Sequence, residues 1–207
     1  MALIHRATLD PSKLDLLRAW LPSRPWFPAG AEIESLGAYR FDDPDGEVGL
    51  EAFLLRAGDV VLHVPLTYRA SAPDVPDEHR LGTTEHSVLG TRWVTDGCAD
   101  PVWVRELVRT VLTGTTQAVE EVETDGRLHP REPSATAQGS GTAGAPVPTV
   151  GRLTVHDGST TTQVDAEGVV VRVVRVLGDA PAGSSTLTAT WSTGSGTVAS
   201  VDVTFSD

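Results

Sequence analysis

Apolar residues recur at helical spacing in two short segments of the chain. The first segment starts at Asp10-Pro11, where Asp suits an N-cap and Pro suits the first helical position, and Pro22 ends it. The second starts at Asp100-Pro101 and ends at Gly114. Their apolar stripes are Leu14, Leu17 and Leu21, and Val104, Leu107, Val108 and Val111. We therefore expect two short helices.

The remaining apolar runs are rich in β-branched residues and are separated by turn residues, which predicts strands. The expected strands are 36–41, 48–56, 60–68, 88–95, 118–123, 150–155, 169–177, 186–191 and 197–205. The acidic segment 42–47 has the density of a calcium loop but lacks the alternating ligands and distal Glu of an EF-hand, so a hairpin turn is favoured.

Between these groups of strands, residues 129–149 are rich in Pro, Gly, Ala, Ser and Thr and have hardly an apolar anchor. Such a composition predicts a flexible linker or a long disordered loop. The expected organisation is a domain over 1–128, this linker, and a small β unit over 150–207. The fold class is α+β: a twisted, mostly antiparallel sheet packed by two helices, followed by the all-β unit.

The composition excludes several classes of function. The net charge is −12, Lys13 is the only lysine, and no basic run is present, so we expect no binding to nucleic acid or to an anionic membrane. No apolar run reaches the ~18 residues of a membrane span. The N-terminus lacks the pattern of a signal peptide, and Cys98 is the only cysteine. We expect a soluble cytoplasmic protein.

The stretch 81–101 is the densest polar and glycine-rich part of the sequence. Glu85 and His86, with His79 or Cys98 nearby, could form an acid–base pair or bind a metal. Their spacing matches no zinc pattern, so a histidine engaged in ordinary hydrogen bonds is favoured. The chain contains no P-loop, no Gly-x-Gly-x-x-Gly fingerprint and no Gly-x-Ser-x-Gly elbow. We expect no catalytic residue, no metal and no cofactor.

An aromatic elbow follows the first helix, in the sequence Trp20-Leu21-Pro22-Ser23-Arg24-Pro25-Trp26-Phe27. Its large rings favour packing over the sheet, because aromatic side chains bury large areas in small domains. The alternative is that Trp26 and Phe27 are exposed and form a partner surface.

With the helix before it, the elbow resembles the start of the N-terminal cap of bacterial maltokinases, and residues 81–101 are similar to actinobacterial cap-like proteins of this type. The resemblance extends over residues 1–112. Maltokinases phosphorylate maltose with ATP and carry their catalytic residues in a large C-terminal lobe, which this chain of 207 residues does not reach.

A second resemblance lies in 151–177. Maltokinase-like N-lobes contain a polar Glu-Gln-Ser-Asn-Thr-Ser run and then a strand with a lysine that contacts ATP phosphates. Here Ser159 and Thr161 match the Ser and Thr, Thr160 stands at the Asn position, and Arg172 stands at the lysine position. The resemblance implies a degenerate kinase N-lobe subdomain with these four residues as nucleotide-binding candidates. The guanidinium of arginine is planar and wider than the ammonium of lysine, so Arg172 keeps the charge but not the geometry. The catalytic Asp and the Mg²⁺-binding acids of phosphoryl transfer are not found downstream.

The resemblance thus implies a non-catalytic, stand-alone maltokinase cap-like protein. We expect a binding or regulatory module near maltose, trehalose or α-glucan metabolism, whose partner is an enzyme of the maltose or trehalose pathway. One alternative is a module that senses ATP or a sugar without phosphoryl transfer. The other is an enzyme of unrelated chemistry that uses Glu85 and His86.

Overall fold

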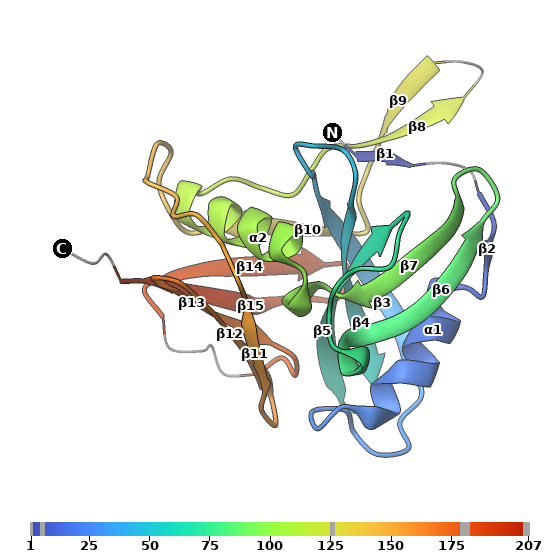
Figure 1. Ribbon diagram of the computed structural model, residues 1–207, viewed down its shortest axis with the longest axis horizontal. Helices are drawn as coiled ribbons and strands as arrows, with labels where there is room; N and C mark the ends of the chain where they lie inside the picture. Colours follow the sequence, from blue (N-terminus) through green and yellow to red (C-terminus); the bar gives the residue numbers. More distant parts are fainter. Residues whose placement is uncertain (1, 5–6, 125–126, 179–182, 205–207) are drawn as a thin grey trace.

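The computed structural model describes residues 2–4, 7–124, 127–178 and 183–204. These residues form two six-stranded antiparallel sheets, a small three-stranded sheet and two α-helices (Figure 1). The predicted α+β class with a further all-β unit is confirmed. Neither helix is long and apolar enough to cross a membrane.

The N-terminal sheet has the strand order β2-β6-β7-β5-β4-β3 and curls around one end of the molecule (Figure 1). Its strands are β2 (Leu9–Asp10), β3 (Ile33–Phe41), β4 (Gly49–Ala57), β5 (Val60–Arg69), β6 (Arg80–His86) and β7 (Gly90–Asp96). The predicted strands 36–41, 48–56, 60–68 and 88–95 correspond to β3, β4, β5 and β7. Three short 3-10 helices lie at Leu21–Ser23, Asp77–His79 and Gly97–Ala99.

Successive side chains of a strand point to opposite faces of the sheet. Strand β4 is buried on both faces, because a hydrophobic cluster packs on each of them. On β4, Leu50 and Leu54 belong to one hydrophobic cluster and Phe53 and Leu55 to another. The second cluster lies under helix α1 (Lys13–Trp20) and the aromatic elbow. The first also contains residues of helix α2 (Pro101–Thr113) and of the C-terminal sheet, so one core joins the two large sheets.

Helix α2 follows the predicted pattern. Asp100 is the N-cap and accepts a hydrogen bond from the backbone N–H of Val102, Pro101 is the first helical residue, and Gly114 ends the helix with a φ of +65°. Helix α1 begins later than predicted. Its N-cap is Ser12, which forms a capping box with Asp15, so the predicted start at Asp10-Pro11 is wrong.

Strand β6 was not predicted, because Leu81 is its only large apolar residue. Its polar residues pair in register with β7, and the register shifts between Arg80 and Gly82. Gly82 has a φ of +131°, a conformation that side chains with a Cβ rarely adopt. Residues 87–89, part of which was predicted as strand, form the turn between β6 and β7.

The C-terminal sheet has the order β10-β14-β15-β13-β12-β11. Its strands are β10 (Ala135–Gly139), β11 (Thr154–Asp157), β12 (Thr161–Ala166), β13 (Val169–Val174), β14 (Ser185–Trp191) and β15 (Gly194–Val203). The predicted strand 150–155 corresponds to β11, which starts at Thr154 instead of Val150, and β12 was not predicted. The valines of β13 alternate between the core and the outer face, with Val171 and Val173 fully buried.

The predicted linker over 129–149 is wrong for a large part of its length. Residues 135–139 form β10, the strand at one edge of the C-terminal sheet, with Ala135 and Ala137 buried. Beyond it the chain runs against the end of α2, where the N–H groups of Gly141 and Thr142 donate to the carbonyls of Val111 and Leu112 at 2.9 and 3.0 Å. These bonds satisfy carbonyl groups that a helix end leaves without partners.

Glycine makes this contact possible because the two backbones approach closely. A Cβ at Gly141 would lie 1.9 Å from the carbonyl oxygen of Leu112, and one at Gly139 would lie 2.0 Å from that of Thr110. The glycines that suggested flexibility therefore allow a tight packing contact.

The small sheet consists of β1 (Ala2–Ile4), β8 (Glu120–Thr124) and β9 (Arg127–Arg131), with β1 parallel to β8. The β8–β9 pair projects from the rest of the molecule (Figure 1). Strand β8 corresponds to the predicted strand 118–123, whereas β9 includes the start of the predicted linker.

Candidate functional site

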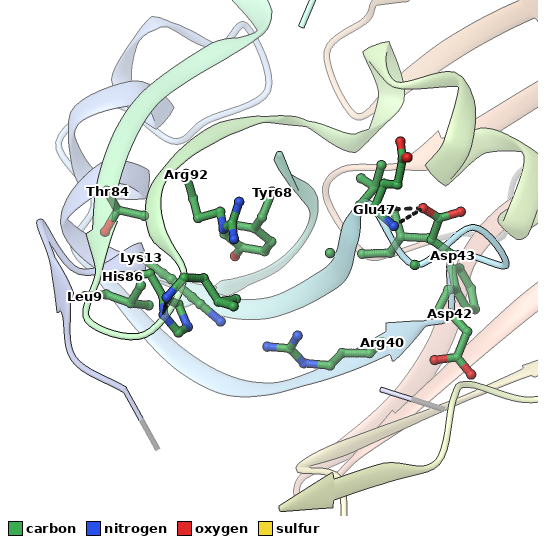
Figure 2. A pocket seen from close by; sticks show the side chains of 16 residues that line it. Leu9, Lys13, Arg40, Asp42, Asp43, Glu47, Tyr68, Thr84, His86 and Arg92 are labelled. Carbon is green, nitrogen blue, oxygen red and sulfur yellow. Dashed lines mark hydrogen bonds between the residues drawn. The ribbon is translucent and has the colours of Figure 1, made fainter. Parts of the chain in front are cut away.

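A pocket of about 440 Å³ lies where the N-terminal sheet curls toward the start of α1. Figure 2 shows side chains from β2, α1, β3, β5, β6 and β7 and from the turn between β3 and β4 around it. The polar and charged residues of its lining are Lys13, Arg40, Asp42, Asp43, Glu47, Tyr68, Thr84, His86 and Arg92.

Three residues of this lining donate hydrogen bonds to the carboxylate of Glu51, which is buried. Lys13 Nζ lies 2.5 Å and Tyr68 Oη 2.8 Å from its Oε2, and Arg40 Nη2 lies 2.8 Å from its Oε1. The Lys13 ammonium also lies 5.0 Å from the centre of the Tyr68 ring. Strand pairing explains the arrangement, since Arg40 is directly opposite Glu51 on β3 and Lys13 enters from the first turn of α1.

The electrostatics of this group favour a charged Glu51. Burial would raise the pKa of Glu51, but the charges of Arg40 and Lys13 outweigh burial and lower it to about 2. Burial lowers the pKa of Lys13, and Glu51 offsets part of that effect. Burial and the nearby Glu51 raise the pKa of Tyr68 well above its usual value, so its phenol stays protonated and donates.

The charges continue beyond the pocket toward the small sheet. Arg40 Nε lies 4.0 Å from Glu120 on β8, and Glu120 lies 3.8 Å from Arg131 on β9. Burial raises the pKa of Glu120, against the charges of Arg40 and Arg131. The row of ion pairs therefore connects the pocket with the projecting β8–β9 pair.

The acidic side of the pocket is the turn between β3 and β4, and the predicted hairpin is confirmed there. The Asp43 carboxylate accepts from the backbone N–H groups of Asp45, Glu47 and Val48 at 2.9 to 3.2 Å, which holds the turn closed. In Figure 2, Asp42, Asp43 and Glu47 lie on one side of the pocket, and Lys13, His86 and Arg92 on the other.

A second charged group, which the sequence analysis missed, lies between the two large sheets. Arg175 is completely buried and donates to Asp96 Oδ2 and, at 2.7 Å, to Thr162 Oγ1. Its guanidinium also lies 4.9 Å from the centre of the Trp26 ring. Burial would raise the pKa of Asp96, but Arg175 outweighs burial and lowers it. Thr162 is on β12 and Arg175 directly follows β13, whereas Asp96 is the last residue of β7. The ion pair therefore joins the two large sheets.

The four nucleotide-binding candidates lie in the turn before β12, on β12 and on the neighbouring β13. Ser159 and Thr160 are exposed in the turn before β12, and Thr161 pairs with Val174. Arg172 is opposite Gln163 and Ser200 and forms an ion pair with Asp202 at 2.6 Å. None of the four lines the pocket described above.

The aromatic elbow packs against the N-terminal sheet, which is the arrangement that the sequence analysis favoured. Trp26 is 2 % exposed and meets Trp20 edge-to-face with ring centres 5.9 Å apart, while Phe27 is partly buried against the same cluster. The alternative of an exposed partner surface is wrong for Trp26.

The favoured interpretation of His86 is also confirmed. Its Nδ1 accepts from the backbone N–H groups of Val88 and Leu89 at 3.2 and 3.1 Å, and Glu85 accepts from Thr91. Cys98 lies in the core, and burial raises the pKa of its thiol. Within the described parts of the chain, no group of three or more His, Cys, Asp or Glu side chains is placed to hold a metal ion.

Comparison with known families identifies one part of this structure. Residues 20–100 match the family model of the maltokinase N-terminal cap domain. The match runs from the aromatic elbow through β3 to β7 and ends at the N-cap of α2, so it contains most of the pocket. No curated protein matches the chain. Over residues 20–100 the chain is therefore similar to the maltokinase N-terminal cap domain family.

Proposed function

We propose that the chain is a non-catalytic binding or regulatory module that acts near maltose, trehalose or α-glucan metabolism. Its partner would be an enzyme of the maltose or trehalose pathway. The observation that carries this proposal is the match of residues 20–100 to a domain named for its position in maltokinases.

The state of the buried carboxylates supports a role without catalysis. A general base works best when its pKa is near the operating pH. Glu51 and Asp96 have lowered pKa values instead, and each is engaged by cations, Glu51 by Lys13 and Arg40 and Asp96 by Arg175. Such groups hold side chains in place and are poorly suited to accept a substrate proton.

A coupled assay that detects ADP tests the absence of phosphoryl transfer. The purified protein is incubated with Mg·ATP and either maltose or glucosamine, and we expect no turnover above the buffer control. Turnover that co-purifies with the protein and is lost in Arg172→Ala would contradict the proposal. Arg109→Ala is the matched control, because Arg109 is a partly exposed arginine of α2 that pairs with Glu106.

The second candidate function is a sensor that binds ATP or a sugar without transferring a phosphoryl group. The pocket beside Glu51 favours this candidate, because its volume of about 440 Å³ is within the range of small-molecule sites. Calorimetric titrations with ATP, ADP and maltose test it. Saturable binding that Ser159→Ala and Arg172→Ala abolish would place a nucleotide at the residues of the kinase-like run. Binding that these variants leave unchanged would indicate that the ligand occupies the pocket beside Glu51 instead.

A further inference from the structure

One side of the pocket beside Glu51 gathers positively charged side chains. Lys13 and Arg40 both donate to the Glu51 carboxylate, and Arg40 also lies 4.0 Å from Glu120. The Lys13 and Arg40 side chains remain 23 % and 18 % exposed, which leaves part of each accessible from the pocket.

Arg92 adds a third cation to the same lining. It is on β7 opposite Thr84 of β6, and it is partly buried. Within the described residues its guanidinium has no hydrogen bond or ion pair, unlike those of Arg40, Arg69 and Arg175. A guanidinium that lines a pocket without a partner is a ready donor to an anion, because its fork of N–H groups matches the oxygens of phosphate.

The opposite side of the pocket carries acidic side chains. Asp42 and Glu47 line it from the turn between β3 and β4, and Figure 2 shows them away from Lys13 and Arg92. Carboxylates accept hydrogen bonds from hydroxyl groups and repel a second anion. The ligand that fits both sides has one anionic end and a neutral end rich in hydroxyl groups.

We propose that this pocket binds a small phosphorylated sugar, with the phosphate at Arg92 and Lys13 and the sugar hydroxyls toward Glu47. A monophosphate carries about two negative charges at neutral pH, which the cations of one side can match. A nucleoside triphosphate carries more charge and would bring part of it toward Asp42 and Glu47. The inference rests on the sensor function proposed above and names its ligand class and its site.

Isothermal titration calorimetry of the full chain tests this inference. The probes are glucose 6-phosphate, glucose, inorganic phosphate, glucuronate and ATP, each at the same ionic strength because salt screens such contacts. Glucose 6-phosphate should bind saturably and at least about tenfold more tightly than each of the other probes. Glucose lacks the anionic group, inorganic phosphate lacks the sugar hydroxyls, glucuronate carries a single negative charge, and ATP carries more charge than the cations of one side can match.

Two variants locate the site. Arg92→Gln should weaken binding of glucose 6-phosphate by about tenfold or more, and Arg92→Lys should recover part of the affinity. Arg56→Gln is the matched control, since Arg56 is an exposed arginine on β4 of the same sheet and does not line the pocket. It should leave the affinity unchanged. Unfolding curves of all three variants should overlay that of the unaltered chain.

Three results would overturn the inference. The first is no saturable heat with glucose 6-phosphate up to about 10 mM, a concentration that would reveal even millimolar affinity. The second is equal affinity for inorganic phosphate or for ATP. The third is an equal loss in Arg92→Gln and Arg56→Gln. None of them would affect the proposed association with a pathway enzyme, because that association is measured with proteins and not with this ligand.

Discussion

The two charged groups of this protein use the same chemistry in different surroundings. Between the large sheets, Arg175 and Asp96 are both fully buried, and the hydroxyl of Thr162 accepts a further hydrogen bond from the guanidinium. At the curl of the N-terminal sheet, Glu51 is buried but its cationic partners are partly exposed. Among the residues that the structure describes, Arg92 in the same pocket has no hydrogen-bond or ion-pair partner. The first group is sealed from solvent, although Arg175 Nη1 has no hydrogen-bond partner among the described residues, whereas the second retains donors that face a pocket.

This difference separates a structural role from a binding role. A buried ion pair constrains the geometry of the elements that carry it, because either charge left alone is costly. A partly exposed group can exchange its contacts with a ligand at lower cost. We therefore propose that the Arg175–Asp96 pair joins the two sheets and that the pocket beside Glu51 is a recognition site.

The largest effect is expected when the buried pair between the sheets is broken. Arg175→Met should lower the free energy of unfolding by about 3–5 kcal/mol, because it leaves the Asp96 carboxylate buried without its cation. Denaturant unfolding followed by circular dichroism measures the loss.

The double variant Arg175→Met with Asp96→Asn is the control for this mechanism. Asparagine keeps the oxygen that accepts from the Cys98 N–H but carries no charge, so the double variant should be more stable than Arg175→Met alone. A double variant that is less stable than Arg175→Met would show that the unpaired charge is not the cause.

The next largest effect concerns the pocket. Glu51→Gln should lower the free energy of unfolding at pH 7 by about 2–3 kcal/mol, because the pKa of Glu51 is held at about 2 in the folded chain. This stabilisation is complete above about pH 4.5 and is lost as the pH falls toward 2, so the two stability curves should converge over that range. Glu34→Gln is the control, since Glu34 forms an exposed pair with Arg56; an equal loss there would contradict the account.

A smaller effect should appear as the pH falls below neutrality. Burial, aided by the charge of Arg175, lowers the pKa of His63 to about 3. Because the unfolded chain binds this proton near pH 6.5, stability is lost as the pH falls from 6.5 toward 3, by about 2 kcal/mol at pH 5. In His63→Gln the slope between pH 6.5 and 5 should be shallower. His156→Gln, at an exposed position on β11, should keep it, and an unchanged slope in His63→Gln would refute the assignment.

The smallest effect is expected at the residue that stands at the kinase lysine position. Arg172 and Asp202 are each about one third exposed, and pairs of this kind contribute little. Arg172→Ala should therefore cost about 1 kcal/mol or less in thermal or denaturant unfolding. A loss as large as that of Arg175→Met would show that the two arginines do not differ as their burial indicates.

Local signals made part of the fold predictable. Helix α2 was predicted with its correct ends because Asp100, Pro101 and Gly114 act through their own backbone positions. The start of α1 was predicted too early because Ser12, with Asp15 three residues later, is the capping pair that the chain uses. Strand β6 was missed because pairing with β7, and not an apolar pattern, determines it.

Long-range contacts made the rest unpredictable. The glycines of 139–141 suggested a linker, because composition does not reveal that α2 lies against them. Arg175 was overlooked in favour of Arg172, although both are on or next to the same strand, because its partner Asp96 is 79 residues away in sequence. The pocket was missed for the same reason, since Lys13, Arg40 and Arg92 are brought together only by the curled sheet.

The measurement that tests the central claim most directly is capture of the tagged protein from a lysate of its native cells, with bound proteins and small molecules identified by mass spectrometry. The account predicts stoichiometric recovery of an enzyme of maltose or trehalose metabolism, and a preparation that transfers no phosphoryl group once that enzyme is removed. Recovery of no such enzyme, together with ATP turnover by the isolated chain, would contradict it.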